Sequence, residues 1–221
     1  MKELNNPHTQ RYNILILGPQ GSGKGTQAEK ISKRLLIPHI SPGAMYRQIK
    51  QENSTFAKKI AHCIDRGELV PDDITNDLIL KRVRNAECSH GFILDGYPRN
   101  LIQAEFIKKQ IPIEYIITIE LSDAVGIERI GGRRVCPQGH TYHSVYNPPK
   151  KKDICDLDNL PLSIRADEKP EIIKQRLGIY HRQTKPIIEI LKTIPRVKTI
   201  PVDGAPSIED VACEIQRKLG V

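Results

Sequence analysis

The 221-residue chain contains no tryptophan, and aromatic residues make up only 5% of it. So few rings leave little surface on which unpaired bases could stack, which argues against a single-stranded nucleic-acid binder. The sequence also lacks a run of about 20 apolar residues, the length that a membrane-spanning helix needs. The first ten residues, MKELNNPHTQ, lack the apolar core of a signal peptide. We therefore predict a cytoplasmic protein with neither a membrane nor a nucleic acid as partner.

The chain has few cysteines, and their number is odd. The five cysteines are Cys63, Cys88, Cys136, Cys155 and Cys213. An odd count argues against a disulfide framework and favours free thiols or metal ligands. Basic residues, by contrast, are in excess: 34 lysines and arginines against 26 acidic residues give a net charge of +8. This surplus suits anionic ligands, although a basic, soluble surface would show the same composition.

Short apolar runs alternate with helical patterns along the chain. The predicted strands cover 12–18, 91–95, 114–121 and 197–202. The predicted helices cover 25–36, 43–50, 55–64, a segment starting at Pro71, 100–109, a segment capped by Ser122 and Asp123, and 207–219. This alternation predicts an α/β fold, a doubly wound parallel sheet flanked by helices. Between Arg133 and Ala166 the alternation stops, over a stretch too long for an ordinary loop, which indicates a functional lid or a small subdomain.

A phosphate-binding loop follows the first predicted strand. GPQGSGK, from Gly18 to Lys24, fits the pattern G-x-x-x-x-G-K between a strand and a helix. Glycines let backbone N–H groups turn toward an anion, and Lys24 can reach the terminal phosphates. The usual pattern has serine or threonine next, as a Mg²⁺ ligand, but here Gly25 takes that place and Thr26 follows.

Further motifs stand in order along the chain. They are GPQGSGKGT at 18–26, HISPGAMYR at 39–47, GELVPDD at 67–73, GFILDGYPRNLIQA at 91–104, ERIGGRR at 128–134, YHSVYNPPK at 142–150, RADE at 165–168 with Arg176 beyond it, and VDGAPS at 202–207. By these motifs the chain resembles the adenylate kinases, within the nucleoside monophosphate kinases, over about residues 12–218.

The resemblance implies an activity and an organisation. The family transfers the γ-phosphoryl group of ATP to AMP reversibly, with Mg²⁺, giving two ADP. It implies a single P-loop kinase domain over residues 1–221, with an NMP-binding helical part at 41–70 and a long lid at 133–168. The expected partners are the small molecules ATP, AMP and ADP, and the expected state is a monomer.

The resemblance also implies roles for individual residues. For catalysis these are Lys24, Arg99, Arg133, Arg165 and Arg176. For ATP they are Gly18, Gly21, Ser22, Gly23, Lys24, Gly25, Thr26, Arg129 and Arg133, with Arg129 covering the adenine. For AMP they are Pro42, Arg47, Leu69, Val70, Gly96, Arg99, Gln103, Arg165 and Arg176. Asp95, at the end of a predicted strand, would hold Mg²⁺ through water. The side-chain amide of Gln103 would read the adenine of AMP.

Two residues depart from the family pattern. The family reads S-T-G-D-M-L-R where this chain has Pro42 and Ala44 in place of the threonine and the aspartate. Losing one hydrogen bond could weaken discrimination between acceptors by about 1 kcal/mol or somewhat more. A nucleoside monophosphate kinase with a broader choice, or one that takes CMP or UMP, therefore stands as the alternative.

The predicted lid holds a possible metal site. Cys136, His140, Cys155 and Asp158 have side chains that suit structural Zn²⁺, and the spacing of the last two matches zinc-bearing lids of the family. His143 is the other candidate, but it falls in a Tyr-His pair that metal-free lids also carry. Two free thiols among polar neighbours are the alternative to zinc.

Two other classes of protein fit the sequence less well. A P-loop GTPase would need an N-K-x-D motif, and the sequence has none. A basic P-loop protein that binds nucleic acid fits the net charge, but the basic residues are spread along the chain. A nucleotide kinase is therefore the reading that the sequence favours.

Overall fold

The structure is a computed structural model, and it describes residues 11–165 and 167–221. Its centre is a parallel sheet with the strand order β2-β3-β1-β4-β7. The strands are β1 (Tyr12–Leu17), β2 (His39–Ile40), β3 (Gly91–Asp95), β4 (Tyr115–Glu120) and β7 (Lys198–Asp203). In register, Ile16 of β1 lies beside Asp95 of β3 and Ile117 of β4. The strands therefore end together at one edge, where open α/β sheets bind ligands.

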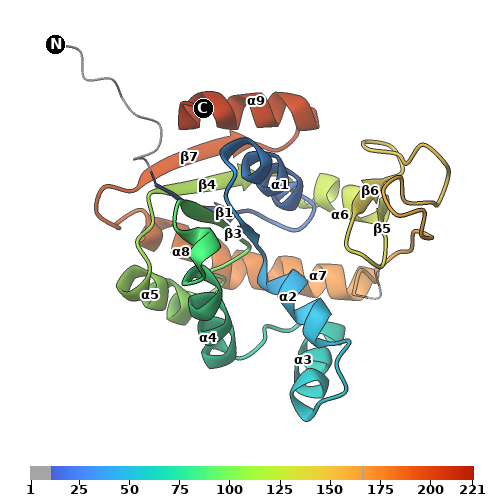
Figure 1. Ribbon diagram of the computed structural model, residues 1–221, viewed down its shortest axis with the longest axis horizontal. Helices are drawn as coiled ribbons and strands as arrows, with labels where there is room; N and C mark the ends of the chain where they lie inside the picture. The colour runs from blue at the N-terminus through green and yellow to red at the C-terminus, as the bar shows by residue number, and fades with distance from the viewer. Residues whose placement is uncertain (1–10, 166) are drawn as a thin grey trace.

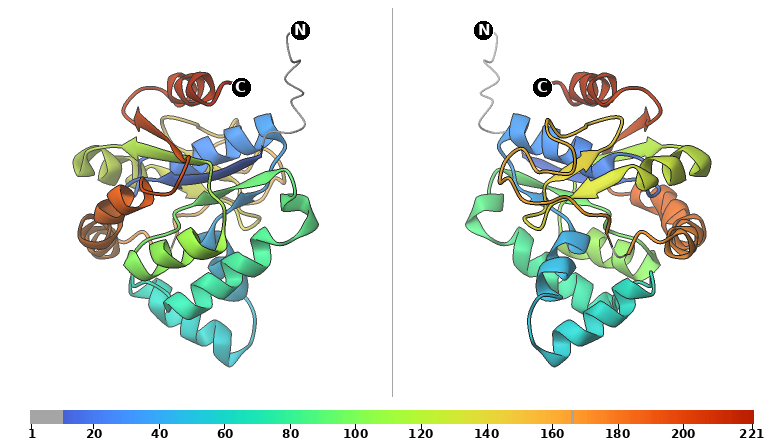
Figure 2. Two further views of the ribbon diagram at one scale, coloured as in Figure 1. Left: turned by 90° about the vertical axis from the view of Figure 1, so that its left-hand side faces the viewer. Right: turned by 90° about the vertical axis from the view of Figure 1, so that its right-hand side faces the viewer.

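Helices cover both faces of the sheet (Figure 1). They are α1 (Lys24–Leu35), α2 (Pro42–Ile49), α3 (Thr55–Asp65), α4 (Asp72–Val83), α5 (Leu101–Gln110), α6 (Asp123–Gly131), α7 (Pro170–Ile179), α8 (Lys185–Leu191) and α9 (Ile208–Leu219). A 3₁₀ turn covers Ala86–Cys88, and a π-helical turn, Tyr180–Thr184, joins α7 to α8. Figure 2 shows α3 at the end of the molecule opposite α9.

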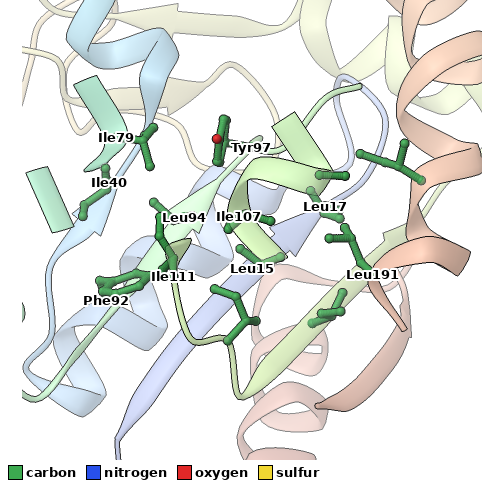
Figure 3. Packing of buried hydrophobic residues seen from close by; sticks show 14 of the residues in the cluster. Leu15, Leu17, Ile40, Ile79, Phe92, Leu94, Tyr97, Ile107, Ile111 and Leu191 are labelled. Atoms are coloured by element: carbon green, nitrogen blue, oxygen red, sulfur yellow. The ribbon is translucent and has the colours of Figure 1, made fainter. Parts of the chain in front are cut away.

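The two faces of the sheet bury alternate residues of each strand, as side chains of a strand must. Leu15 and Leu94 join one core with α4, α5 and α8, and Figure 3 shows them near Ile107 of α5. Ile14 and Ile93 join the other core, with α1 and α9. Strands covered on both faces read as continuous apolar runs, which is why the sequence revealed them.

The stretch from Arg133 to Arg165 is built differently. A short antiparallel hairpin, β5 (Arg133–Val135) and β6 (Thr141–His143), is joined to the later chain by isolated bridges such as Val135 to Ser163. Its buried apolar cluster is small and consists of Cys136, Tyr142 and Cys155. The predicted irregular segment is therefore an ordered unit with little core of its own.

The doubly wound α/β fold is confirmed, and the predicted strands and helices agree with the observed ones to within a residue or two. One local prediction was wrong. Ser122 precedes α6, but its hydroxyl makes no capping bond, while Asp123 accepts from His181 at 2.9 Å. None of the helices in the described residues is long and apolar enough to cross a membrane. The prediction about MKELNNPHTQ lies outside the described residues.

Candidate active site

The phosphate loop connects β1 to the first turn of α1. Gly21 and Gly23 have φ angles of 79° and 84°, in the left-handed region that favours glycine. A Cβ at Gly21 would also lie 2.2 Å from the carbonyl oxygen of Gly126. No side chain caps the N-terminus of α1. Its first N–H groups therefore lack an intrahelical partner and face the loop, which is a ready anion site.

Lys24 is the first residue of α1, and its ammonium lies over the loop. Its Nζ donates to the carbonyl oxygen of Pro19 at 2.9 Å. The Lys24 pKa is lowered to about 8. Burial of the charge is the main cause, Asp95 opposes it, and the nearby cations Arg99 and Arg133 add to the lowering. An ammonium this poorly solvated gains strongly from an anionic ligand.

Asp95 ends β3 beside the loop. Its Oδ2 lies 3.2 Å from Nε2 of His39. Burial alone would raise the Asp95 pKa, but the hydrogen bond from His39 and the charges of Lys24 and Arg99 hold it below its usual value. At Gly25, where the usual motif has a hydroxyl side chain, the structure leaves little room for a side chain. A Cβ there would lie only 3.3 Å from Asp95 Oδ2. The glycine keeps the space in front of the carboxylate open.

Arginines from separate elements converge on one cavity of about 1020 Å³. Arg133 Nη1 lies 2.6 Å from Glu168 Oε1, Arg165 shares that carboxylate at 3.6 Å, and Arg176 pairs with Asp167 at 2.9 Å. Burial, with the nearby positive charges, lowers the Arg165 pKa to about 10. Concentrated positive charge of this kind fits a ligand with several negative charges.

Two different helices bring groups suited to bases to the cavity wall. Gln103 is buried, and its side-chain oxygen accepts from the backbone N–H of Arg99 at 2.8 Å. Arg129 donates to the carbonyl oxygens of Gly204 and Ala205 and lies 5.3 Å from the ring centre of Tyr146. A flat guanidinium anchored at its rim offers a surface on which a base can stack.

The structure brings all the residues predicted to bind nucleotide to the wall of this cavity. They are Gly18, Gly21, Ser22, Gly23, Lys24, Gly25, Thr26, Pro42, Arg47, Leu69, Val70, Asp95, Gly96, Arg99, Gln103, Arg129, Arg133, Arg165 and Arg176. These positions span more than 150 residues of sequence, so the fold assembles them into one site.

The predicted metal ligands form a second, separate group. One ligand atom from each of Cys136, His140, Cys155 and Asp158 lies within 4.8 Å of all the others. His140 Nδ1 is 3.1 Å from Asp158 Oδ2 and 3.3 Å from Cys136 Sγ. His143 stays outside, since its Nε2 lies 2.9 Å from the carbonyl oxygen of Arg129 and its Nδ1 accepts from backbone N–H groups. Of the two histidines, only His140 is placed to share a metal ion with the cysteines.

Comparison with known proteins agrees with this geometry. A sequence model of the adenylate kinase family matches residues 16–195. The chain belongs to the adenylate kinase family. It is 42% identical to the adenylate kinases of Lachnospira eligens and Thermoanaerobacter pseudethanolicus, over 94% of this chain and 99% and 97% of theirs. It is 40% identical to the adenylate kinase of Caldicellulosiruptor saccharolyticus, over 94% of this chain and 99% of that one.

Membership of the adenylate kinase family confirms the class of enzyme that the motifs predicted. Adenylate kinases are transferases that bind ATP, AMP and ADP and use Mg²⁺ with ATP. The two departures from the family pattern are visible in the site. Pro42 is buried as the first residue of α2, where its missing N–H is tolerated, and Ala44 is exposed on the cavity wall.

The structure adds residues that sequence reasoning did not single out. His39 contacts Asp95, Glu168 and Asp167 hold the arginines, and Asp72 contacts Gln103. His39, Asp167 and Glu168 stand inside motifs that carry the resemblance, and those motifs could have identified them. Asp72 also stands inside such a motif, GELVPDD, but its contact with Gln103, 31 residues away, has no local mark in the sequence.

Proposed function

We propose that the chain catalyses reversible transfer of the γ-phosphoryl group from ATP to AMP, with the residue roles described below. The observation that carries this proposal is the convergence of Lys24 and arginines from separate elements on one cavity, whose wall also carries groups suited to bases. Phosphoryl transfer needs positioning and charge stabilisation rather than a protein nucleophile.

The donor side of the site is the phosphate loop. The loop amides and Lys24 hold the β- and γ-phosphates of ATP, and Arg129 covers the adenine. Arg133, Arg165 and Arg176 surround the phosphoryl group in transit, where charge spreads over its equatorial oxygens. The carboxylates of Asp167 and Glu168 already orient these guanidinium groups.

The acceptor side lies between α2, α4 and α5. Arg47 and Arg99 hold the AMP phosphate, and Gln103 contacts its base. The attacking atom is a phosphate oxygen that is already anionic, so no general base is required. The bond from that oxygen to the γ-phosphorus forms as the bond from the γ-phosphorus to the bridging oxygen of ATP breaks. Both products are ADP, one formed from AMP and the other left from ATP.

The divalent ion that accompanies ATP fits the edge of the sheet. Asp95 keeps an ionised carboxylate at the cavity, with open space over Gly25. A carboxylate that binds through water is typical of magnesium sites with phosphate ligands. The ion would offset the charge on the phosphate oxygens, while Lys24 and the arginines orient the reacting groups.

We assign two parts that close over the nucleotides, an NMP-binding part at 41–70 and a lid at 133–168. Both lie on the wall of the same cavity, through residues such as Arg47 and Arg133. Closure excludes water, which would otherwise accept the γ-phosphoryl group. We expect the enzyme to act as a monomer in the cytoplasm, as the sequence predicted.

The lid cluster fits structural zinc. Two sulfurs, one imidazole nitrogen and one carboxylate oxygen lie within 4.8 Å of one another, which supplies the four ligands that a structural zinc ion takes and leaves no position open for catalysis. The backbone N–H of Gln138 donates to Cys136 Sγ, and Tyr142 Oη lies 3.4 Å from Cys155 Sγ, so outer groups support the ligands. A bound ion would staple a segment with little core.

The direct test is ADP formation from Mg-ATP with AMP, CMP, UMP or GMP as acceptor. We expect strong preference for AMP, because Gln103 is in place on the acceptor wall. Comparable rates with CMP or UMP would favour the alternative acceptor, since Pro42 and Ala44 would then have changed the site. A chain that uses none of these acceptors would contradict the proposal.

A further inference from the structure

The side-chain amide of Gln103 is held between two partners of opposite kind. Its Oε1 accepts from the backbone N–H of Arg99 at 2.8 Å, and its Nε2 donates to Asp72 Oδ1 at 2.7 Å. A backbone N–H can only donate, and an ionised carboxylate can only accept. Turning the amide over would set its NH₂ against an N–H and its oxygen against a carboxylate. Only one orientation of the amide is therefore compatible with its neighbours.

Asp72 contacts Gln103 from behind the nucleotide cavity. It is the first residue of α4 and lines a separate groove with Asn100, whereas Gln103 lines the main cavity. Asn100 Nδ2 donates to the same Oδ1 at 2.8 Å, and Asn100 Oδ1 accepts from the backbone N–H of Gln103 at 3.0 Å. This network fixes the carboxylate at the start of α4 relative to the first turn of α5.

The fixed amide leaves one N–H and one oxygen lone pair for a base. Adenine offers an amino donor at position 6 beside a ring acceptor at N1, while a 6-oxopurine offers a carbonyl acceptor beside an N1–H donor. The two purine edges therefore need opposite orientations of the same amide. We infer that Asp72 is a positioning residue that makes the acceptor site prefer 6-aminopurines over 6-oxopurines by locking the Gln103 amide. The inference rests on the proposed function, in which Gln103 contacts the acceptor base.

The test compares AMP with inosine 5′-monophosphate, because the two differ only at the edge that Gln103 would read. Asp72→Asn keeps the size of the side chain but replaces the acceptor-only carboxylate with a group that also donates. We expect the ratio of kcat/KM for AMP to that for inosine monophosphate to fall about tenfold, which is the scale of one charge-assisted hydrogen bond. The change should lie mainly in KM for the acceptor, since the phosphate ligands are untouched.

The matched control is Asp73→Asn, an exposed carboxylate next in the same helical turn. It removes the same charge near the helix N-terminus without touching Gln103, so its acceptor ratio should equal that of the wild type. In a Gln103→Leu background, Asp72→Asn should no longer change the ratio, because the residue through which it acts is gone. Asp72→Ala, with Asp73→Ala as its control, is the second variant, because it removes every acceptor next to Gln103 Nε2, whereas the amide oxygen in Asp72→Asn can still accept.

The outcomes separate this inference from the proposed function. An enzyme that prefers AMP, with the same ratio in both Asp72→Asn and Asp72→Ala, overturns the role of Asp72 alone. An equal loss of kcat/KM for AMP and for inosine monophosphate in the Asp72 variants also overturns that role. An equal change of the acceptor ratio in Asp73→Asn does so too. A wild-type chain that phosphorylates neither nucleotide overturns the proposed function and this inference with it.

Discussion

The parallel sheet and the segment 133–165 both deliver charged side chains to the same cavity, yet different forces hold them in shape. Leu15, Leu94 and their neighbours are completely removed from solvent between two helical layers. In the segment, by contrast, Val145 and Leu157 are each 72% exposed, and the buried cluster is built around two cysteines and a tyrosine. Hydrophobic burial accounts for the first region, and a compact polar cluster accounts for the second.

This contrast fits the proposed division of the site into a rigid part and a movable lid. The sheet holds the phosphate loop and Asp95 at fixed positions, because its strands are buried on both faces. The two apolar cores of the sheet include no residue of the segment, which has its own small cluster, so we expect the segment to move as a unit. A lid needs that combination of internal order and weak attachment.

The largest expected effect is on activity, and it should be shared by both regions. Lys24→Ala, on the sheet side, and Arg165→Ala, in the segment, should each lower kcat/KM by at least about 100-fold, because in the proposed mechanism each removes a charge that stabilises the transferring phosphoryl group. The melting temperature should change little in either variant, since neither side chain belongs to an apolar core. Full activity in purified Lys24→Ala protein would reject its assignment.

A pair of leucine substitutions compares the two regions in stability. Leu94→Ala should lower the free energy of unfolding by about 2–5 kcal/mol, because it opens a cavity in the sheet core. Leu157→Ala, at an exposed position in the segment, should change it by less than about 0.5 kcal/mol. Urea unfolding followed by circular dichroism measures both. Equal losses would show that the segment depends on apolar burial as the sheet does.

Metal removal should affect the segment and spare the sheet. Cys155→Ser, or treatment with a chelator, should raise hydrogen exchange of amides within 133–165 at least about tenfold, while exchange in β1 and β3 stays slow. Cys213→Ser is the control, because that thiol is exposed on α9. The wild-type protein, purified without chelator, should contain one zinc per chain. Metal-free protein with an equally protected segment would favour the alternative of two free thiols.

The smallest expected effect is a dependence of kcat/KM on pH, caused by Lys24 on the sheet side of the site. The Lys24 pKa is lowered to about 8, so this ammonium loses its proton as the pH rises through that value. The kcat/KM for ATP should then fall about tenfold per pH unit above pH 8. Lys24→Arg should lose this dependence, whatever its absolute rate, because a guanidinium stays protonated there.

The same shift has an opposite effect on stability. The unfolded lysine keeps its proton up to its ordinary pKa, so the unfolded chain binds more protons than the folded one between about pH 8 and 10.4. The contribution of Lys24 to folding stability therefore rises with pH in that window. Thermal unfolding of wild type and Lys24→Arg across this range would separate it from the other titrating groups.

The two regions also differ in how much of them the sequence revealed. The strands over Tyr12–Leu17 and Gly91–Asp95 were predicted because continuous apolar runs mark buried strands. The two-residue strand β2 is too short to show a pattern, and the β5–β6 hairpin has arginines and a histidine where an alternating pattern would be expected. In that segment the fold depends on contacts between polar side chains, which periodicity does not report.

The candidate site shows the same limit. The phosphate loop and all the predicted arginines except Arg176 were identifiable because each stands in a local motif. The contacts of Asp72 with Gln103 and of His39 with Asp95 join residues 31 and 56 positions apart. Pairings of that kind follow from the packing of helices and strands, and a single sequence carries no local mark of them.

Because carboxylates already pair with the arginines, nucleotide binding exchanges one anionic partner of each guanidinium group for another. In the structure Glu168 lies between Arg133 and Arg165, and Asp167 pairs with Arg176. These guanidinium groups therefore meet a phosphate with a protein anion already beside them, and part of the water around them has already been removed. The paired arginines carry less unneutralised positive charge than their number implies, so added salt has less charge to screen. Nucleotide affinity should therefore fall less steeply with ionic strength than it would for a site of isolated cations.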